Sequence, residues 1–271
     1  MLTRESRLLA VAWCPLHTLG VGGGYTQADV AELARALTGW SVGEPESESG
    51  VTGAFDFKPN WHEPGEREIL GKHYAQSGVE QAREALDDLA RRPATARHIA
   101  TKLARHFVAD NPPSDLVDSL TRRFSVSDGD LMAVAEALVA DDRTWSAKAT
   151  KARTPFEFFV AAARATGFTP LEPGPYLQAL GLLGEPLWSP AGPNGFSDSS
   201  DAWTSPESMK LRLDLAATMG ERMGAHAEPL EVLDAAVGNT ASQETREAVA
   251  HAESRQQALA LVFMAPEFQR R

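Results

Sequence analysis

Apolar and polar residues alternate along the chain in the pattern of amphipathic helices. Apolar side chains recur at three- and four-residue spacing, which places them on one face of a helix. Capping residues or prolines mark the start of most of these stretches. We therefore predict a mainly α fold, with helices that begin near residues 26, 77, 93, 113, 127, 155, 175, 205, 229, 242 and 253.

The same spacing predicts which side of each helix faces the core. In the helix from Pro93 the apolar stripe is Ile99, Leu103 and Phe107, and we expect it to be buried. In the next helix the stripe expected to be buried consists of Leu116, Val117, Leu120 and Phe124.

Strand signals are confined to one short region. Residues 54–58 alternate between apolar and polar side chains, and residues 66–70 follow the turn signal Glu63-Pro64-Gly65. We expect these two segments to pair as one small antiparallel hairpin.

A stretch rich in proline and glycine runs from residue 169 to residue 204. A loop of this length is either functional or disordered. Disordered segments are poor in aromatic residues, whereas this one contains Trp188, Phe196 and Trp203. We therefore predict an ordered loop that is packed by its own aromatic side chains.

Composition narrows the class of protein. The 271 residues carry 26 Lys and Arg against 37 Asp and Glu, a formal net charge of −11, which argues against a nucleic-acid binder. The single cysteine, Cys14, excludes an internal disulfide framework. No apolar run approaches the roughly 20 residues of a transmembrane helix, so we expect a soluble protein, cytoplasmic as the chain stands.

Several motifs follow one another in order along the chain. Residues 17–30 read His-Thr-Leu-Gly-Val-Gly-Gly-Gly-Tyr-Thr-Gln-Ala-Asp-Val, and Leu-Thr-Gly-Trp follows at residues 37–40. The later blocks include Phe55-Asp56-Phe57, His62-Glu63-Pro64-Gly65-Glu66-Arg67, Phe107-Val108-Ala109-Asp110, Pro155-Phe156-Glu157-Phe158, Pro193-Asn194-Gly195-Phe196, Trp203-Thr204-Ser205-Pro206 and Pro266-Glu267-Phe268-Gln269. From about Leu16 to Arg270 this series resembles the bacterial domain of unknown function 1800 family.

The resemblance carries expectations of its own. Family members are usually longer, so this chain resembles their C-terminal portion, and we expect residues 21–271 to form a single helical domain. Before the His-Thr-Leu-Gly block the family carries an acidic helix, which residues 4–16 do not match. Residues 1–20 are therefore expected to be an atypical segment left by a truncation or a frameshift.

The resemblance also bears on location and partners. Full-length members of the family are often exported, and they are often encoded beside a sulfatase-like protein, which implies a protein partner. No activity is generally established for the family, so the resemblance supplies fold and context rather than chemistry.

Two sets of side chains are candidates for catalysis. His62, Glu63 and His73 supply two imidazoles and a carboxylate, which are ligands that zinc or another divalent metal takes. Asp198 and Asp201 lie in the aromatic loop and would provide acid–base chemistry or hold a cation. The alternative is that the histidines occupy a turn and a surface position. Their spacing matches no standard metal motif, so the cofactor is left open.

Ligand binding has candidates of its own. Trp188, Asn194, Phe196 and Trp203 combine flat apolar surfaces with polar groups, as small-molecule and glycan sites do. Arg97 lies on a basic helix face that suits an anionic ligand or an acidic partner surface. The alternatives are a loop that only packs on the protein body and a helix face that is only solvated.

The lack of a compact catalytic motif favours a binding or assembly module that acts with a partner protein. One alternative is a metal-assisted or acid–base hydrolase that uses the histidines and aspartates named above. The other is a non-functional fragment of a longer family member.

Overall fold

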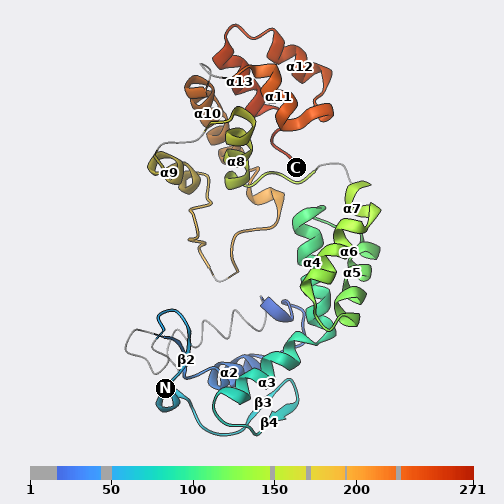
Figure 1. Ribbon diagram of the computed structural model, residues 1–271, viewed down its shortest axis with the longest axis vertical. Coiled ribbons are helices and arrows are strands. Elements are labelled where there is room, and N and C mark those ends of the chain that lie inside the picture. Colours follow the sequence, from blue (N-terminus) through green and yellow to red (C-terminus); the bar gives the residue numbers. More distant parts are fainter. Residues whose placement is uncertain (1–16, 44–50, 147–149, 169–171, 193, 224–226) are drawn as a thin grey trace. The chain divides into compact units, whose positions relative to one another are not determined.

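The chain divides into two compact units. Unit 1 comprises Met1–Phe107 and Pro112–Trp145, and unit 2 comprises Val108–Asn111 and Ser146–Arg271. The structure, a computed structural model shown in Figure 1, describes residues 17–43, 51–146, 150–168, 172–192, 194–223 and 227–271. The expectations for residues 1–16, including Cys14, lie outside the described residues, and the expectation of a single domain stays a prediction.

Unit 1 combines helices with two small sheets (Figure 1). In chain order its elements are α2 (Gln27–Ala36), β1 (Trp40–Val42), β2 (Phe55–Phe57), the 3₁₀ turn η2 (Pro59–Trp61), β3 (Arg67–Ile69), β4 (Lys72–Tyr74), α3 (Val79–Ala90), α4 (Pro93–Phe107), α5 (Ser114–Val126), α6 (Leu131–Ala140) and α7 (Asp142–Ser146), whose last residue belongs to unit 2.

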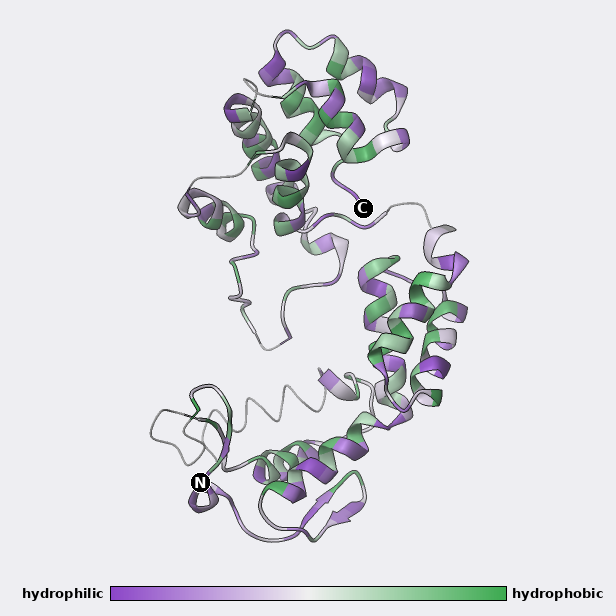
Figure 2. Ribbon diagram, viewed as in Figure 1, coloured by the Kyte–Doolittle hydropathy of each residue, from purple (hydrophilic) through white to green (hydrophobic). Residues whose placement is uncertain are grey.

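Unit 2 is helical, and its long loop connects the second of its helices to the third. In chain order its elements are α8 (Pro155–Thr166), α9 (Gly174–Leu182), η3 (Ser200–Ala202), α10 (Pro206–Met223), α11 (Pro229–Val237), η4 (Gly238–Thr240), α12 (Gln243–Ala250) and α13 (Arg255–Met264). Figure 2 shows helices in which hydrophobic and hydrophilic residues alternate, as amphipathic helices require.

The mainly α class is confirmed by the described residues, which form twelve α-helices and two two-stranded sheets. Local capping explains why the helix starts were predictable. Thr26 and Asp29 form a capping box at α2, and Thr154 and Glu157 form another at α8. The start of α6 lies later than predicted because Asp130, rather than Ser127, accepts the first backbone N–H groups.

The predicted strand pairing is wrong. Residues 55–57 do form a strand, but β2 pairs antiparallel with β1, and β3 pairs antiparallel with β4. Leu70 and Gly71 have φ angles of 52° and 76°, the positive values that a tight two-residue hairpin turn of the I′ type requires. That turn directs β3 back onto the residues that follow it, so β3 is not the partner of β2.

The predicted inward face of α4 is also wrong. Phe107 is 56% exposed, and Ile99 and Leu103 are only partly buried. The buried residues of α4 are Thr95, Ala96, Ala100 and Ala104. The buried residues of the neighbouring α5 are those predicted, Leu116, Val117, Leu120 and Phe124. Small side chains on α4 leave room for the large ones on α5, so packing selects the alanine face.

The core of unit 2 is centred on α10 and α13, which cross closely at Gly220. A Cβ atom at Gly220 would lie 2.4 Å from the carbonyl oxygen of Gln256 in α13, so only glycine permits this approach. The largest apolar side chains of this core are fully or almost fully buried, and they include Phe158, Leu180, Leu233, Phe263 and Phe268.

The C-terminal residues of the chain close unit 2. The backbone N–H of Arg153 donates to the carbonyl of Gln269, and Ala152 forms a β-bridge with Arg270. The buried guanidinium of Arg212 donates to the side chain of Gln269 and to the carbonyl of Arg153. Burial lowers the pKa of Arg212 to about 10. The Pro-Glu-Phe-Gln block at residues 266–269 is therefore part of the fold itself.

Candidate functional site

A pocket of about 480 Å³ opens in unit 2 between the end of α9, the long loop and the first turns of α10. Its walls are mostly apolar: Phe196 and Trp203 come from the loop, Leu183 follows α9, and Leu211 lies on α10. Glu207, in the first turn of α10, supplies the one charged side chain among the lining residues described.

The two aromatic walls of the pocket are fixed to the loop. Trp203 is only 6% exposed, and its indole N–H donates to the carbonyl of Ser197 at 3.2 Å. The rings of Phe196 and Trp203 lie with their centroids 6.4 Å apart, tilted by 58°. The predicted ordered, aromatic loop is therefore observed from Phe196 to Trp203.

An ion pair between the buried Lys151 and the half-buried Asp110 holds the base of the loop. The Lys151 ammonium donates to Asp110 Oδ1 at 2.7 Å and to the carbonyl of Asp198 at 2.6 Å. Asp110 Oδ2 accepts from the backbone N–H of Ser200, and the Ser200 hydroxyl accepts from the backbone N–H of Ala152. Lys151 is buried, so water competes little for its ammonium, and these contacts hold residues 198–200 in one place.

The electrostatics of this anchor follow from its contacts. Burial by itself raises the pKa of the Asp110 carboxyl. Hydrogen bonds from Lys151 and Ser200 act in the opposite direction and leave the pKa below its ordinary value. Asp110 is therefore ionised at neutral pH and balances the buried charge of Lys151.

Phe196 and Trp203 are the two predicted loop residues that line the pocket. Trp188 does not line it; its side chain is 91% exposed and its φ angle is 55°. Asn194 is exposed and does not line the pocket either. The loop thus places a buried Trp203 and a half-buried Phe196 at the pocket and leaves the indole of Trp188 exposed.

The two aspartates predicted for acid–base chemistry lie beside the pocket rather than in its lining. Asp198 contributes its backbone carbonyl to the anchor with Lys151. Asp201 is exposed in η3. Sequence reasoning missed Glu207, because Ser205-Pro206-Glu207 carries a strong helix-start signal that accounts for all three residues without a ligand. It also missed Lys151, for which no local motif gives a signal.

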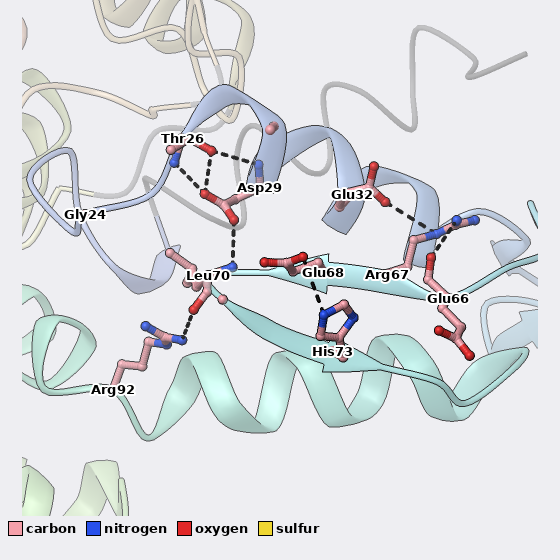
Figure 3. A pocket seen from close by; sticks show the side chains of 12 residues that line it. Gly24, Thr26, Asp29, Glu32, Glu66, Arg67, Glu68, Leu70, His73 and Arg92 are labelled. Carbon is pink, nitrogen blue, oxygen red and sulfur yellow. Dashed lines mark hydrogen bonds and ion pairs between the residues drawn. The ribbon is translucent and has the colours of Figure 1, made fainter.

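Unit 1 carries a larger cleft, of about 850 Å³, at the start of α2 and along the β3–β4 hairpin (Figure 3). Its lining is highly charged and includes Asp29, Glu32, Arg67, His73 and Arg92. Figure 3 shows that most of these side chains are directed at neighbouring groups of the protein itself.

Two charged residues of this cleft form hydrogen bonds with the backbone of Leu70 in the hairpin turn. Asp29 accepts from the backbone N–H of Leu70 at 2.6 Å while it caps α2 through Thr26 (Figure 3). Burial raises the pKa of Asp29, but the hydrogen bonds from Thr26 and Leu70 outweigh it, so the pKa lies below its ordinary value. Arg92 donates to the carbonyl of Leu70.

Arg67 is hydrogen-bonded to the turn that precedes β3. It is buried, and its guanidinium donates to the carbonyl oxygens of Glu63, Pro64 and Glu66. The side chains of Asp29, Arg92 and Arg67 are already hydrogen-bonded to backbone groups of the protein. The larger cleft is therefore the weaker candidate for ligand binding, and we regard the pocket of unit 2 as the candidate site.

The structure gives His62 and Glu63 a local role. A ring nitrogen of His62, Nδ1, lies 2.9 Å from the carbonyl oxygen of Thr38, and the backbone N–H of Glu63 donates to the Thr38 hydroxyl at 2.8 Å. The Glu63 carboxylate lies 3.3 Å from Arg35 of α2. The Leu-Thr-Gly-Trp and His-Glu-Pro-Gly blocks are therefore joined to each other through Thr38.

His73 lies apart from this contact and is strongly exposed. It pairs across the hairpin with Glu68, and their side chains lie 3.5 Å apart. The cleft that His73 lines does not include His62 or Glu63. Among the residues that the structure describes, no three His, Cys, Asp or Glu side chains are grouped as metal ligands are.

Arg97, the predicted contact for an anion, makes an ion pair with Asp118 of α5 at 2.7 Å. Both side chains are exposed, so the pair links two helices at the surface of unit 1. The catalytic, metal and anion roles of these residues remain predictions.

Comparison with known proteins places the chain in a family. The family model described as "Protein of unknown function (DUF1800)" matches residues 14–270, so the resemblance seen in the motifs is confirmed over nearly the whole chain. No curated protein and no solved structure matches the chain. Within the described residues, no helix has the length and apolar character needed to cross a bilayer.

Proposed function

Since the chain belongs to the DUF1800 family, described only as of unknown function, we propose that it is a binding module whose ligand occupies the pocket of unit 2. The observation that carries the proposal is a 480 Å³ pocket walled by Phe196, Trp203, Leu183 and Leu211, with Glu207 at its edge. Mostly apolar walls with a few polar groups, enclosing roughly 300–1,000 Å³, are typical of small-molecule sites.

The frame of this pocket supports the proposal further. The Lys151–Asp110 pair and the hydrogen bond from Trp203 to Ser197 hold residues 197–203 in place without a ligand. A pre-organised loop spares a ligand the entropic cost of ordering it, which raises affinity for a given contact area.

The proposal is tested with N-phenyl-1-naphthylamine, an uncharged fluorescent probe of apolar pockets. We expect saturable binding with one site per chain, followed by the increase in probe fluorescence. Ala191 and Ala202 line the pocket and are exposed, so Ala191→Phe with Ala202→Phe narrows it without touching the core. This double variant is expected to bind the probe at least about ten-fold more weakly.

The matched control is Ala217→Phe, an exposed position of α10 that does not line the pocket. It adds the same aromatic ring to unit 2 and is expected to leave probe binding unchanged. Equal affinity in the double variant, or no saturable binding by the natural chain, would show that the pocket is not a ligand site.

A protein partner forms the second part of the proposal and is supported by unit 1. The outer face of α6 and α7 exposes Leu131, Met132, Val139 and Trp145, each by more than 60%. Exposed helix faces are ordinarily polar, and a group of large apolar side chains at the surface is typical of protein-interaction sites. The sulfatase-like proteins often encoded beside family members are the partner class to examine first.

The partner proposal is tested by co-expressing the chain with a sulfatase-like protein from the same genome and isolating one through a tag on the other. Met132→Glu with Val139→Glu is expected to abolish co-purification, because two buried carboxylates would oppose the contact. Leu213→Glu, an exposed apolar position of α10, is the control. Co-purification that the double variant leaves intact would refute the role of this face.

A further inference from the structure

Trp188 is an exposed residue that the stability of the fold does not explain. Its side chain is 91% exposed, although a tryptophan gains more than most residues from burial. Its φ angle of 55° is one that bulky side chains rarely adopt. The loop therefore holds an indole away from the core in an unfavourable backbone conformation, a combination found at ligand-binding sites.

The position of Trp188 relative to the pocket follows from its neighbours. The backbone N–H of Ser189 donates to the carbonyl of Pro186 at 3.2 Å, which closes a tight turn around Trp188. Pro186 and Ser189 both line the pocket. Because consecutive Cα atoms are about 3.8 Å apart, Trp188 stands at the rim of the pocket.

The polar groups of the pocket restrict the ligand. The lining includes the hydroxyls of Ser189, Ser197 and Ser208 and the carboxylate of Glu207, and no Lys, Arg or His occurs among the lining residues described. A carboxylate repels an anion and accepts hydrogen bonds from hydroxyl groups.

We infer that the pocket takes a neutral carbohydrate, with one sugar ring stacked on Trp188 and the next against Phe196 and Trp203. A sugar ring has a face of C–H groups that packs on an aromatic ring and a rim of hydroxyls that donate to carboxylates. The rim offers the exposed indole of Trp188, and the pocket offers the carboxylate of Glu207 and three serine side chains. This inference rests on the proposed function, since it names the ligand of the same pocket.

A quaternary ammonium ion is the competing ligand for aromatic side chains near a carboxylate. Such ions bind strongly where aromatic faces desolvate them. Trp188 stays almost fully in water, which suits one face of a sugar and does not enclose a cation.

The experiment titrates maltotriose, cellotriose and chitotriose separately into the whole chain and follows the indole N–H signals by two-dimensional NMR. At least one sugar is expected to shift the Trp188 signal in a saturable manner. Trp188→Ala is expected to weaken that binding at least about ten-fold, and Trp188→Phe by no more than about three-fold. Both variants should fold, because Trp188 makes little contact with the core. Trp61→Ala, another exposed tryptophan, is the control.

Three outcomes would overturn the inference. They are no binding of any of the three sugars, saturable binding of choline in their place, and sugar binding that Trp188→Ala leaves unchanged. The probe N-phenyl-1-naphthylamine separates this failure from that of the proposed function. If the probe binds and the sugars do not, the pocket stands and the ligand class is wrong; if neither binds, both proposals fall.

Discussion

Lys151 and Asp110 determine the local electrostatics at the base of the candidate site. Lys151 is buried and depends on a single carboxylate for its charge balance among the ion pairs of the described residues. Removing one partner of a buried pair is costly, because the other charge stays desolvated. The pair therefore contributes to binding by holding residues 198–200, even though it does not line the pocket.

Asp110→Asn is predicted to lower stability in a pH-dependent way. In the folded natural chain the pKa of Asp110 lies below the ordinary value of 3.8. The carboxylate therefore stabilises the fold above that value, and this stabilisation is lost as the pH falls through the folded pKa. At pH 7 we expect a loss of about 1–3 kcal/mol in the free energy of unfolding, measured by urea denaturation. The difference from the natural chain should shrink as the pH falls below about 4.

The control for this prediction is Asp201→Asn, which removes a carboxylate from the same loop. Asp201 is exposed and is in none of the ion pairs found among the described residues. Its substitution is expected to change stability by less than about 0.5 kcal/mol. A loss for Asp110→Asn that stays constant between pH 7 and pH 3 would contradict the assigned role.

Among the secondary-structure elements, the helices were predictable because their signals are local. The capping boxes at Thr26 and Thr154 involve residues three positions apart, so the sequence contains them directly. The buried face of α4 was not predictable, because it depends on the shape of α5. The partner of β3 was not predictable either, since it depends on backbone angles at Leu70 and Gly71.

The candidate site was predictable only in part, as the elements were. Aromatic residues in a proline-rich loop indicated a packed loop, and Phe196 with Trp203 does line the pocket. The sequence contained no sign that Trp188 projects into solvent, because its exposure depends on the turn that Ser189 and Pro186 close. Lys151 and Asp110 lie 41 positions apart, and no motif links them.

Two helical glycines give a matched prediction for the packing of elements. Gly220→Ala is expected to destabilise unit 2 by about 1–3 kcal/mol, because its Cβ would clash with the Gln256 carbonyl of α13. Gly181→Ala in α9 meets no atom within 4 Å and is expected to be neutral or to stabilise by up to about 1 kcal/mol. Urea denaturation measures both. The same loss in both variants would contradict a close approach of α10 and α13.

At the scale of the whole molecule, the course of the chain links the two units. Residues 108–111 connect α4 to α5 of unit 1, yet they belong to unit 2. Asp110 lies in this connection and is held by Lys151 of unit 2. Unfolding of unit 2 would therefore release the segment that joins α4 to α5.

The single domain predicted from the sequence stays a prediction, and scanning calorimetry tests it. We expect one cooperative transition for the natural chain, because residues 108–111 belong to unit 2 and are continuous in the chain with α4 and α5 of unit 1. Removing both partners with Asp110→Ala and Lys151→Ala leaves no unpaired charge and is expected to separate the transition into two. Asp118→Ala, which breaks only an exposed pair with Arg97, should leave one transition. Two resolved transitions in the natural chain would show that the units fold independently, and a single transition in the double variant would show that Asp110 does not couple them.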